Sequence, residues 1–203
     1  MLEIIQVDSE EHNCHVRKLF EENFSLTNLM ISREFDVSFD VNAFLEQEMA
    51  KLQQFFPPSG CLLLAKYEGR IAGCACLRKI SNDVGEVKTM YVRPEYRKKG
   101  IGRSLLQAII YQARFYGYAK VKLECAPFAK EAQALYHSVG FHNIEPYPES
   151  EIPEKYYPHW VFMVMVFWYF VVKIVAMLWV VMKNTQADKT IDRRQLWLHL
   201  PNL

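Results

Sequence analysis

Residues Arg93–Gln107 read RPEYRKKGIGRSLLQ, and this stretch contains the most specific pattern of the sequence. Four positive charges precede two glycines, Gly100 and Gly102, and an apolar helical pattern follows directly. The first N–H groups of a helix have no intrahelical partners, and the helix dipole adds partial positive charge there. Glycines have no side chain that would keep a ligand away from this backbone. The stretch therefore predicts an anion-binding loop at a helix start, with phosphate as the favoured anion.

Two other kinds of phosphate-binding loop do not fit this sequence. A Walker A loop needs Gly-Lys-Ser/Thr after a second glycine, whereas Gly102 is followed by Arg-Ser. A dinucleotide-binding fingerprint needs a third glycine three residues after the second, where this chain has Leu105. The pattern that remains is R-x-x-G-x-G, formed by Arg97, Gly100 and Gly102 between a predicted strand and a predicted helix.

Composition narrows the class of protein. A chain of 203 residues is long enough for one well-buried domain with a short appendage. The formal net charge of +1 gives no global attraction to nucleic acid, and no aromatic platform accompanies the basic loop. Five cysteines without a C-x-x-C pair predict reduced thiols, and the N-terminus lacks the pattern of a signal peptide. We therefore expect a cytoplasmic protein that binds no nucleic acid.

Hydrophobic periodicity predicts alternating strands and helices along the chain. Strands are predicted from apolar or alternating runs at residues 3–7, 61–67, 71–80, 86–92, 120–126 and 159–165. Helices are predicted from apolar positions at helical spacing in the stretch after residue 8, at 41–52, from Gly100 to Gly117, and at 129–139. This order indicates a mixed α/β (α+β) fold, in which helices cover a mostly antiparallel sheet.

Two blocks of the sequence resemble the GNAT superfamily of N-acetyltransferases, and a third stretch, EPYPESEIPEKYYPHWVFM at 145–163, is similar to the closing strands of a small bacterial-type branch. MYVRPEYRKKGIGRSLL at 90–106 matches the family's strand, loop and helix with Q/R-x-x-G-x-G/A, and EAQALYHSVGF at 131–141 matches its helix ending in L-Y-x-x-x-G-F. The resemblance implies a GNAT domain at residues 1–165, with splayed central strands and helices on both faces of the sheet. Two positions depart from the family pattern: APFA at 126–129 replaces a polar residue, and Val164 replaces an acidic one.

The resemblance also implies acetyl-coenzyme A as a co-substrate and no metal. In the family, backbone groups of the strand before the loop pair with the pantetheine amides, and the loop holds the pyrophosphate. These roles fall here on Met90, Tyr91, Val92, Arg97, Lys98, Lys99, Gly100, Ile101, Gly102 and Arg103. Strand alternation would place Met90 and Val92 on the face of Glu86, with Tyr91 on the opposite face. A solvated basic face at an ordinary helix start is the alternative interpretation.

Two residues are candidates for proton transfer. A lysine-like amine has a pKa of about 10.4, so little of it is reactive at neutral pH and some group must accept its proton. The resemblance implies Glu86 as this proton acceptor, directly or through a water. The alternative is that Glu86 forms a structural ion pair with Lys88 or with a basic residue of a neighbouring strand. It implies Tyr136 for the general acid that protonates the coenzyme sulfur, and a packed aromatic ring is the alternative.

We therefore expect an acyltransferase that moves an acetyl group from acetyl-coenzyme A to a primary amine by direct attack. The acceptor is a small molecule or a peptide, and its identity cannot be derived from the sequence. A non-catalytic acyl-coenzyme A sensor on the same scaffold is the alternative function. A homodimer is compatible with either function.

A hydrophobic segment at residues 166–182 begins the extension 166–203 that follows the predicted domain. Its length permits a membrane span, but Lys173 interrupts it. Basic residues follow it, so the positive-inside rule would place the domain outside the cell, away from cytosolic acetyl-coenzyme A. We expect a helix that packs on the domain or on a second subunit. A membrane anchor and an aberrant extension of the reading frame are the alternatives.

Overall fold

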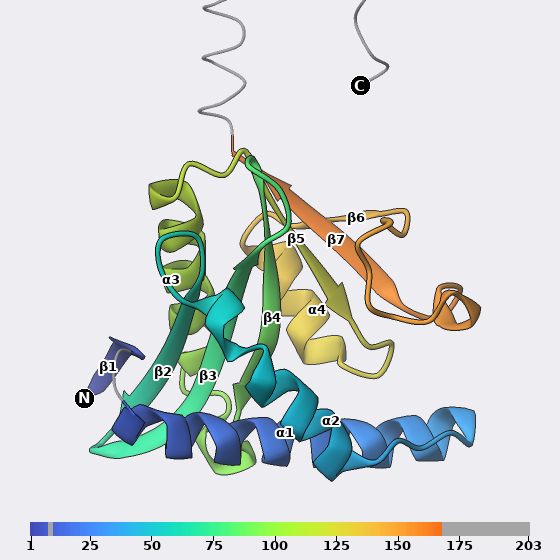
Figure 1. Cartoon of the computed structure of the whole chain (residues 1–203), viewed down its shortest axis with the longest axis horizontal. Coiled ribbons are helices and arrows are strands. Elements are labelled where there is room, and N and C mark those ends of the chain that lie inside the picture. The colour runs from blue at the N-terminus through green and yellow to red at the C-terminus, as the bar shows by residue number, and fades with distance from the viewer. Residues whose placement is uncertain (8–9, 168–203) are drawn as a thin grey trace, which may run out of the picture. The chain divides into compact units, whose positions relative to one another are not determined.

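The computed structural model describes residues 1–7 and 10–167 (Figure 1). Residues Met1–Val166 form one compact unit. Most of the hydrophobic segment expected at 166–182 lies outside the described residues, from residue 168 onward. Within the described residues, no helix combines the length and the apolar character that a membrane crossing requires.

The described chain forms seven strands and four α-helices (Figure 1). The strands are β1 (Leu2–Gln6), β2 (Cys61–Tyr67), β3 (Arg70–Lys79), β4 (Val84–Val92), β5 (Lys120–Cys125), β6 (His142–Ile144) and β7 (Val161–Val166). The α-helices are α1 (Glu10–Phe35), α2 (Val41–Ala50), α3 (Ile101–Phe115) and α4 (Lys130–Ser138). Short 3₁₀ turns occur at Leu52–Phe55, Pro94–Tyr96 and Glu154–Tyr156.

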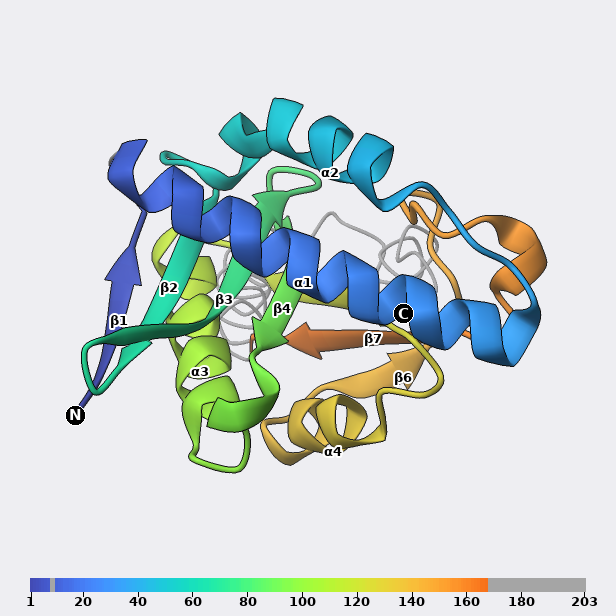
Figure 2. The ribbon, with the colours of Figure 1, turned by 90° about the horizontal axis from the view of Figure 1, so that it is seen from below.

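The strands form one sheet in the order β1-β2-β3-β4-β5-β7-β6. β4 and β5 pair in parallel, and the other neighbouring strands of the described sheet pair antiparallel. Figure 2 shows α1 and α2 over one face of this sheet and α3 and α4 over the other. The predicted mixed fold, with helices on both faces of a mostly antiparallel sheet, is confirmed.

The core lies on both faces of the sheet. On the side of α1 and α2, apolar side chains of these helices pack against β2, β3 and β4, and this cluster includes Phe20, Phe24, Leu64, Cys76 and Tyr91. On the other side, α3 buries the stripe Ile101, Leu105, Leu106, Ile109, Ile110 and Ala113. This spacing is what an amphipathic helix requires, so α3 is held against the sheet along its whole length. The start of α3 is thereby fixed beside the end of β4.

Strand β4 contains a bulge in its middle. Its pairing with β3 joins Cys76 to Lys88 but Cys74 to Tyr91, so β4 uses one residue more than β3 over this distance. Thr89 lies in the bulge and adopts a left-handed φ of 44°. An extra residue in one strand bends that strand and shifts the alternation of its side chains.

The bulge makes the predicted alternation of β4 wrong beyond Lys88. Tyr91 lies in the core on the side of α1 and α2. Met90 and Val92 lie toward the start of α3, because a Cβ added at Gly102 would lie within 4 Å of both side chains. Met90 and Val92 therefore do not share a face with Glu86, since the extra residue reverses the order of the two faces.

The parallel ladder between β4 and β5 is short. It ends at the pair Val87 and Leu123. Past this point β4 continues to Val92 and β5 to Cys125, and the described sheet shows no further pairing between them. Unpaired strand backbone leaves N–H and C=O groups that another partner can use. The implied splay of the central strands is therefore present, and it opens directly before the bulge in β4.

Candidate active site

The loop between β4 and α3 has the backbone shape of an anion-binding site. We call residues 97–103 the cradle loop. Lys98 has a φ of 60° and Gly100 a φ of 80°, so both adopt left-handed backbone. Gly100 is the N-cap of α3, and no side chain caps the first turn. The first N–H groups of α3 therefore face the loop without a side-chain acceptor, which is the arrangement that binds anions.

Three basic side chains of the cradle loop, those of Arg97, Lys99 and Arg103, already have contacts with the protein. Arg97 donates from Nε to the Val92 carbonyl at 3.0 Å, which ties the loop to the end of β4. Arg103 donates from Nη2 to the Ser138 hydroxyl at 2.9 Å and links α3 to α4. The Lys99 ammonium lies 5.1 Å from the Tyr67 ring centroid and 5.4 Å from that of Tyr96. Their predicted role in neutralising phosphate stays a prediction.

Gly102 lies where α3 and α4 approach each other. A Cβ added at Gly102 would lie 3.4 Å from Leu135 Cδ2 and 3.5 Å from Met90 Cε. A methyl group would just fit, and a larger side chain would enter the space between the helix start, α4 and β4. The absence of a side chain at Gly102 therefore keeps this space free beside the end of β4, which does not pair with β5.

Tyr136, the predicted general acid, lies on α4 and is buried. Its ring packs against Phe141, with the centroids 5.9 Å apart. Burial raises the pKa of the Tyr136 phenol well above its usual value. The phenol therefore keeps its proton at neutral pH, as a proton donor must, while its packing also fits the alternative of a structural aromatic residue.

Glu86, the predicted base, lies in the centre of the sheet with its side chain fully buried. Its Oε2 accepts a hydrogen bond from Arg78 Nε at 2.5 Å, and its Oε1 accepts one from the Tyr147 hydroxyl at 2.6 Å. Arg78 is the cross-strand neighbour of Glu86. The ion pair with a basic residue of the neighbouring strand is therefore present. The role of Glu86 as the general base of the reaction stays a prediction.

Burial has the largest effect on the Glu86 carboxyl and raises its pKa, although the charges of Lys88 and Arg78 and the hydrogen bond from Tyr147 act in the opposite direction. A carboxylate with a raised pKa is a better proton acceptor than an exposed one.

A second set of charges lies beside Glu86, at the point where β4 and β5 separate. Lys88 lies one residue past the last paired residue of β4, and Glu124 one past that of β5. Lys88 Nζ is 3.4 Å from Glu124 Oε2 and 2.8 Å from an oxygen of Glu151, which lies on the loop between β6 and β7. The other oxygen of Glu151 accepts a hydrogen bond from Arg78 Nη1 at 2.6 Å.

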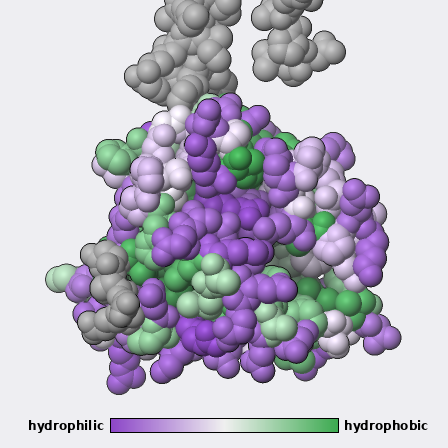
Figure 3. All heavy atoms as spheres, in the orientation of Figure 1, coloured by the Kyte–Doolittle hydropathy of each residue, from purple (hydrophilic) through white to green (hydrophobic). Residues whose placement is uncertain are grey.

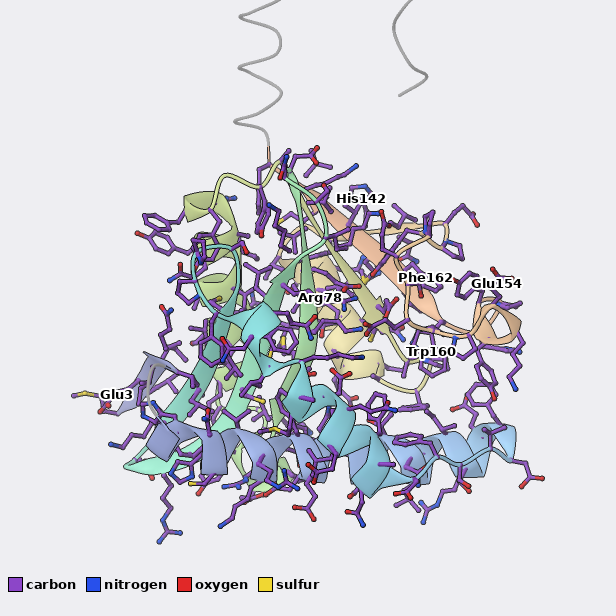
Figure 4. The ribbon with its side chains drawn as sticks, in the orientation of Figure 1. Glu3, Arg78, His142, Glu154, Trp160 and Phe162 are labelled. Atoms are coloured by element: carbon purple, nitrogen blue, oxygen red, sulfur yellow. The ribbon has the colours of Figure 1, made fainter. Side chains whose placement is uncertain are left out.

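We call Arg78, Glu86, Lys88, Glu124, Tyr147 and Glu151 the buried charge cluster. Figure 4 places Arg78 near the centre of the molecule, and Figure 3 shows hydrophilic side chains gathered over the same region. Prediction from the sequence included Glu86, with Lys88 or a basic residue of the neighbouring strand as its alternative ion-pair partner, but missed Glu124, Tyr147 and Glu151. The hairpin register indicates Arg78 opposite Glu86, and strand alternation indicates Glu124. The approach of Tyr147 and Glu151 has no such signal, because both lie on an irregular loop.

A surface cavity of about 620 Å³ lies elsewhere on the molecule. It lies beside α1 and the turn between β2 and β3, and basic side chains dominate its lining: Ile5, His12, His15, Lys18, Lys66, Gly69, Arg70, Ile71, Arg93, Glu95 and Tyr96. It includes none of the residues predicted to bind coenzyme or to transfer protons.

The sequence was compared with protein families and with known proteins. The chain matches the acetyltransferase (GNAT) family over residues 25–141. It is 33% identical over 116 residues to an uncharacterised N-acetyltransferase of Schizosaccharomyces pombe, covering 56% of this chain and 71% of that protein. It is 34% identical over 96 residues to an uncharacterised N-acetyltransferase of Escherichia coli, covering 46% of this chain and 58% of that protein. The second match thus spans little more than half of that relative.

The fold was compared with solved structures. It is similar to the PaiA N-acetyltransferase of Thermoplasma acidophilum, a structure in complex with coenzyme A, with a TM-score of 0.64. That match covers 82% of this chain and 99% of the other at 18% sequence identity. At this identity the likeness concerns the fold.

Proposed function

Because the chain belongs to the acetyltransferase (GNAT) family, we propose that it transfers an acetyl group from acetyl-coenzyme A to the primary amine of a small molecule or a peptide. Acyl transfer from acetyl-coenzyme A to an acceptor is the general chemistry of this family. We assign this activity to the domain formed by residues 1–165. The observation that carries the proposal is the separation of β4 and β5 beside the cradle loop.

The separated strands and the cradle loop would bind the coenzyme together. The loop offers the N–H groups of the first turn of α3, which suit a pyrophosphate. On the side where β4 no longer pairs with β5, the backbone from Met90 to Val92 would pair with the amides of the pantetheine arm. The Val92 carbonyl already accepts a hydrogen bond from Arg97. The thioester would then lie between the strands, with Tyr136 of α4 on one side of the sheet and the buried charge cluster on the other. The fold neighbour from Thermoplasma acidophilum was solved in complex with coenzyme A, which supports acetyl-coenzyme A as the co-substrate.

Acetyl transfer needs one group that accepts a proton and one that donates a proton. The amine nitrogen would attack the thioester carbonyl carbon, forming a C–N bond while the C–S bond breaks. Glu86 would take the proton from the amine, and Tyr136 would give its proton to the departing sulfur. Because both oxygens of Glu86 accept hydrogen bonds within the protein, a water would carry the proton to it.

Release of free thiol from acetyl-coenzyme A tests the proposed function. We expect thiol release that depends on both the protein and an added amine, measured with a panel of amino acids, polyamines, simple amines and peptide N-termini. Mass spectrometry of the amine should show one added acetyl group. Tight binding of acetyl-coenzyme A without thiol release from any amine would instead indicate the alternative function, a sensor.

Glu86→Gln should lower kcat/KM most strongly where the acceptor amine is still protonated. Glutamine keeps the size of Glu86, but it has one acceptor oxygen instead of two and cannot take a proton. In the parent protein the rate should rise as Glu86 ionises, and burial moves this rise above the ordinary pKa of a glutamate. At alkaline pH free amine becomes abundant, so the variant should approach the parent. The measurement is kcat/KM against pH.

Glu48→Gln is the control for this variant, because Glu48 is also a buried glutamate paired with a lysine, Lys51, but lies outside the buried charge cluster. Its profile should follow that of the parent. If Glu86→Gln also follows the parent at every pH, the base is another group. A loss that does not depend on pH and accompanies a lower melting temperature would indicate that Glu86 has a structural role.

A further inference from the structure

Glu151 occupies a position in which a ligand carboxylate would fit. It lies on the loop between β6 and β7, and its two oxygens bind two different cations, Arg78 at 2.6 Å and Lys88 at 2.8 Å. The Arg78 and Lys88 side chains are only 12% and 15% exposed, whereas that of Glu151 is 40% exposed. A carboxylate thus covers two nearly buried cations from the solvent side. Figure 4 shows Arg78 in the middle of the sheet, with Glu154, Trp160 and Phe162 around the end of the same loop.

Each of the two cations has another carboxylate partner deeper in the protein. Arg78 is bound to Glu86 and Lys88 to Glu124, and these two carboxylates are 0% and 6% exposed. If Glu151 moved out, both cations would keep one partner, so neither would be left as an unpaired buried charge. Arg78 Nη1 and Lys88 Nζ would each still direct an N–H group to the place that the Glu151 carboxylate had left. A carboxylate from a ligand would restore both contacts and the same net charge.

The pKa of Glu151 agrees with this description. Burial would raise it, but the hydrogen bonds and charges of Lys88 and Arg78 dominate and lower it to about 2. The two cations therefore strongly favour an ionised carboxylate at this place over a neutral group. An amine without a carboxylate could not form the two contacts that Glu151 makes with Arg78 and Lys88.

The position of Arg78 and Lys88 also suits the proposed acetyl transfer. Lys88 and Glu124 come directly after the last paired residues of β4 and β5, where the strands separate. A carboxylate bound between Arg78 and Lys88 would hold a nearby amine at this opening, and Glu124 and Glu86 would lie close to a positively charged amine. An α-amino acid has both groups on one carbon and suits this arrangement.

Resting on the proposed acetyl transfer, we propose that the acceptor amine carries a carboxylate, which displaces Glu151 and binds between Arg78 and Lys88. Glu151 then acts as an internal competitor of the acceptor. The loop between β6 and β7 would open when an acceptor binds and cover the two cations when none is bound. The other interpretation is that Glu151 only stabilises the fold, and the experiment below distinguishes the two.

The first test compares matched pairs of amines in the thiol-release assay. Each pair consists of an amino acid and the same molecule without its α-carboxylate: phenylalanine and phenethylamine, leucine and 3-methylbutylamine, valine and 2-methylpropylamine. We expect kcat/KM for the favoured amino acid to exceed that of its partner by about a hundredfold, because two charge-assisted hydrogen bonds are lost with the carboxylate. Equal values within every pair would overturn the inference and leave the proposed function standing. No thiol release from these pairs or from the wider panel of amines and peptides would overturn both.

The second test removes the competitor. Glu151→Gln should lower KM for the amino acid by about tenfold, with a smaller change for its decarboxylated partner, since a neutral amide holds the two cations less strongly. Glu149→Gln is the control, because it makes the same change in charge on the same loop, and Glu149 is paired instead with Lys122 at 3.2 Å. An equal effect of both variants, or a rise in KM for the amino acid with Glu151→Gln, would contradict the inference.

Arg78→Lys extends this test to the proposed binding site. Lysine keeps the positive charge beside Glu86 but cannot bind Glu86 and a second carboxylate with the forked geometry of arginine. The preference for the amino acid over its partner should then fall by about tenfold or more. A preference that persists in folded Arg78→Lys would overturn the proposed site.

Discussion

Replacing Gly102 with valine is expected to weaken the binding of acetyl-coenzyme A by at least about a hundredfold, or about 2.7 kcal/mol. A Cβ at this position would already lie 3.4 Å from Leu135 and 3.5 Å from Met90, so the two further methyl groups of valine must occupy the space between α3 and α4. That space lies beside the cradle loop and the end of β4, which does not pair with β5. The coenzyme would have to bind there according to the proposed function. Isothermal titration calorimetry measures the effect directly.

Two controls separate the loss of binding from a loss of folding. Gln107→Val places the same β-branched residue at an exposed position of α3, so it reproduces the change in helix propensity without filling the cradle. It should bind acetyl-coenzyme A as the parent does. The affinity of Gly102→Ala for acetyl-coenzyme A should lie between that of the parent and that of Gly102→Val, because a methyl group makes only ordinary or slightly tight contacts. An unchanged affinity in folded Gly102→Val would overturn the assignment of the cradle.

Replacing Tyr136 with phenylalanine is expected to lower kcat by roughly ten- to a thousandfold while acetyl-coenzyme A still binds. Phenylalanine keeps the ring that packs against Phe141 and removes only the hydroxyl. A coenzyme thiolate is a fair leaving group, with a thiol pKa of about 8.5, so the loss of its proton donor slows the reaction without stopping it. Because burial raises the pKa of the phenol, the parent should keep this acid protonated across the usual range of assay pH.

The comparison must be made where chemistry limits the rate, which single-turnover measurements ensure. Tyr111→Phe is the control, because Tyr111 is an exposed tyrosine on α3, away from the proposed thioester site. It should leave kcat at the parental value. Full turnover by Tyr136→Phe under these conditions would show that Tyr136 is a packed aromatic residue and that the sulfur takes its proton from another source.

Much of the fold could be predicted because its signals are local. The apolar spacing of α3 predicted its buried stripe, and glycines marked both ends: Gly100 and Gly117 both adopt a left-handed φ of 80°. These residues act through their own backbone and their near neighbours, so the sequence contains all that is needed. The bulge in β4 could not be predicted in the same way. It depends on the register between β4 and β3, and an ideal alternation placed Met90 and Val92 on the wrong face.

The candidate site shows the same division. The cradle loop could be predicted from the sequence, because the basic residues, the two glycines and the helix start are consecutive along the chain. Glu86 could be predicted as well, but most of the residues that surround it could not. The folded structure is needed to place Tyr147 and Glu151 over the centre of the sheet, since Glu151, on the loop between β6 and β7, is 73 residues away from Arg78 in the sequence. Such contacts arise because β7 inserts between β5 and β6 and brings its loop over the sheet, and periodicity and turn residues contain no signal of that distance.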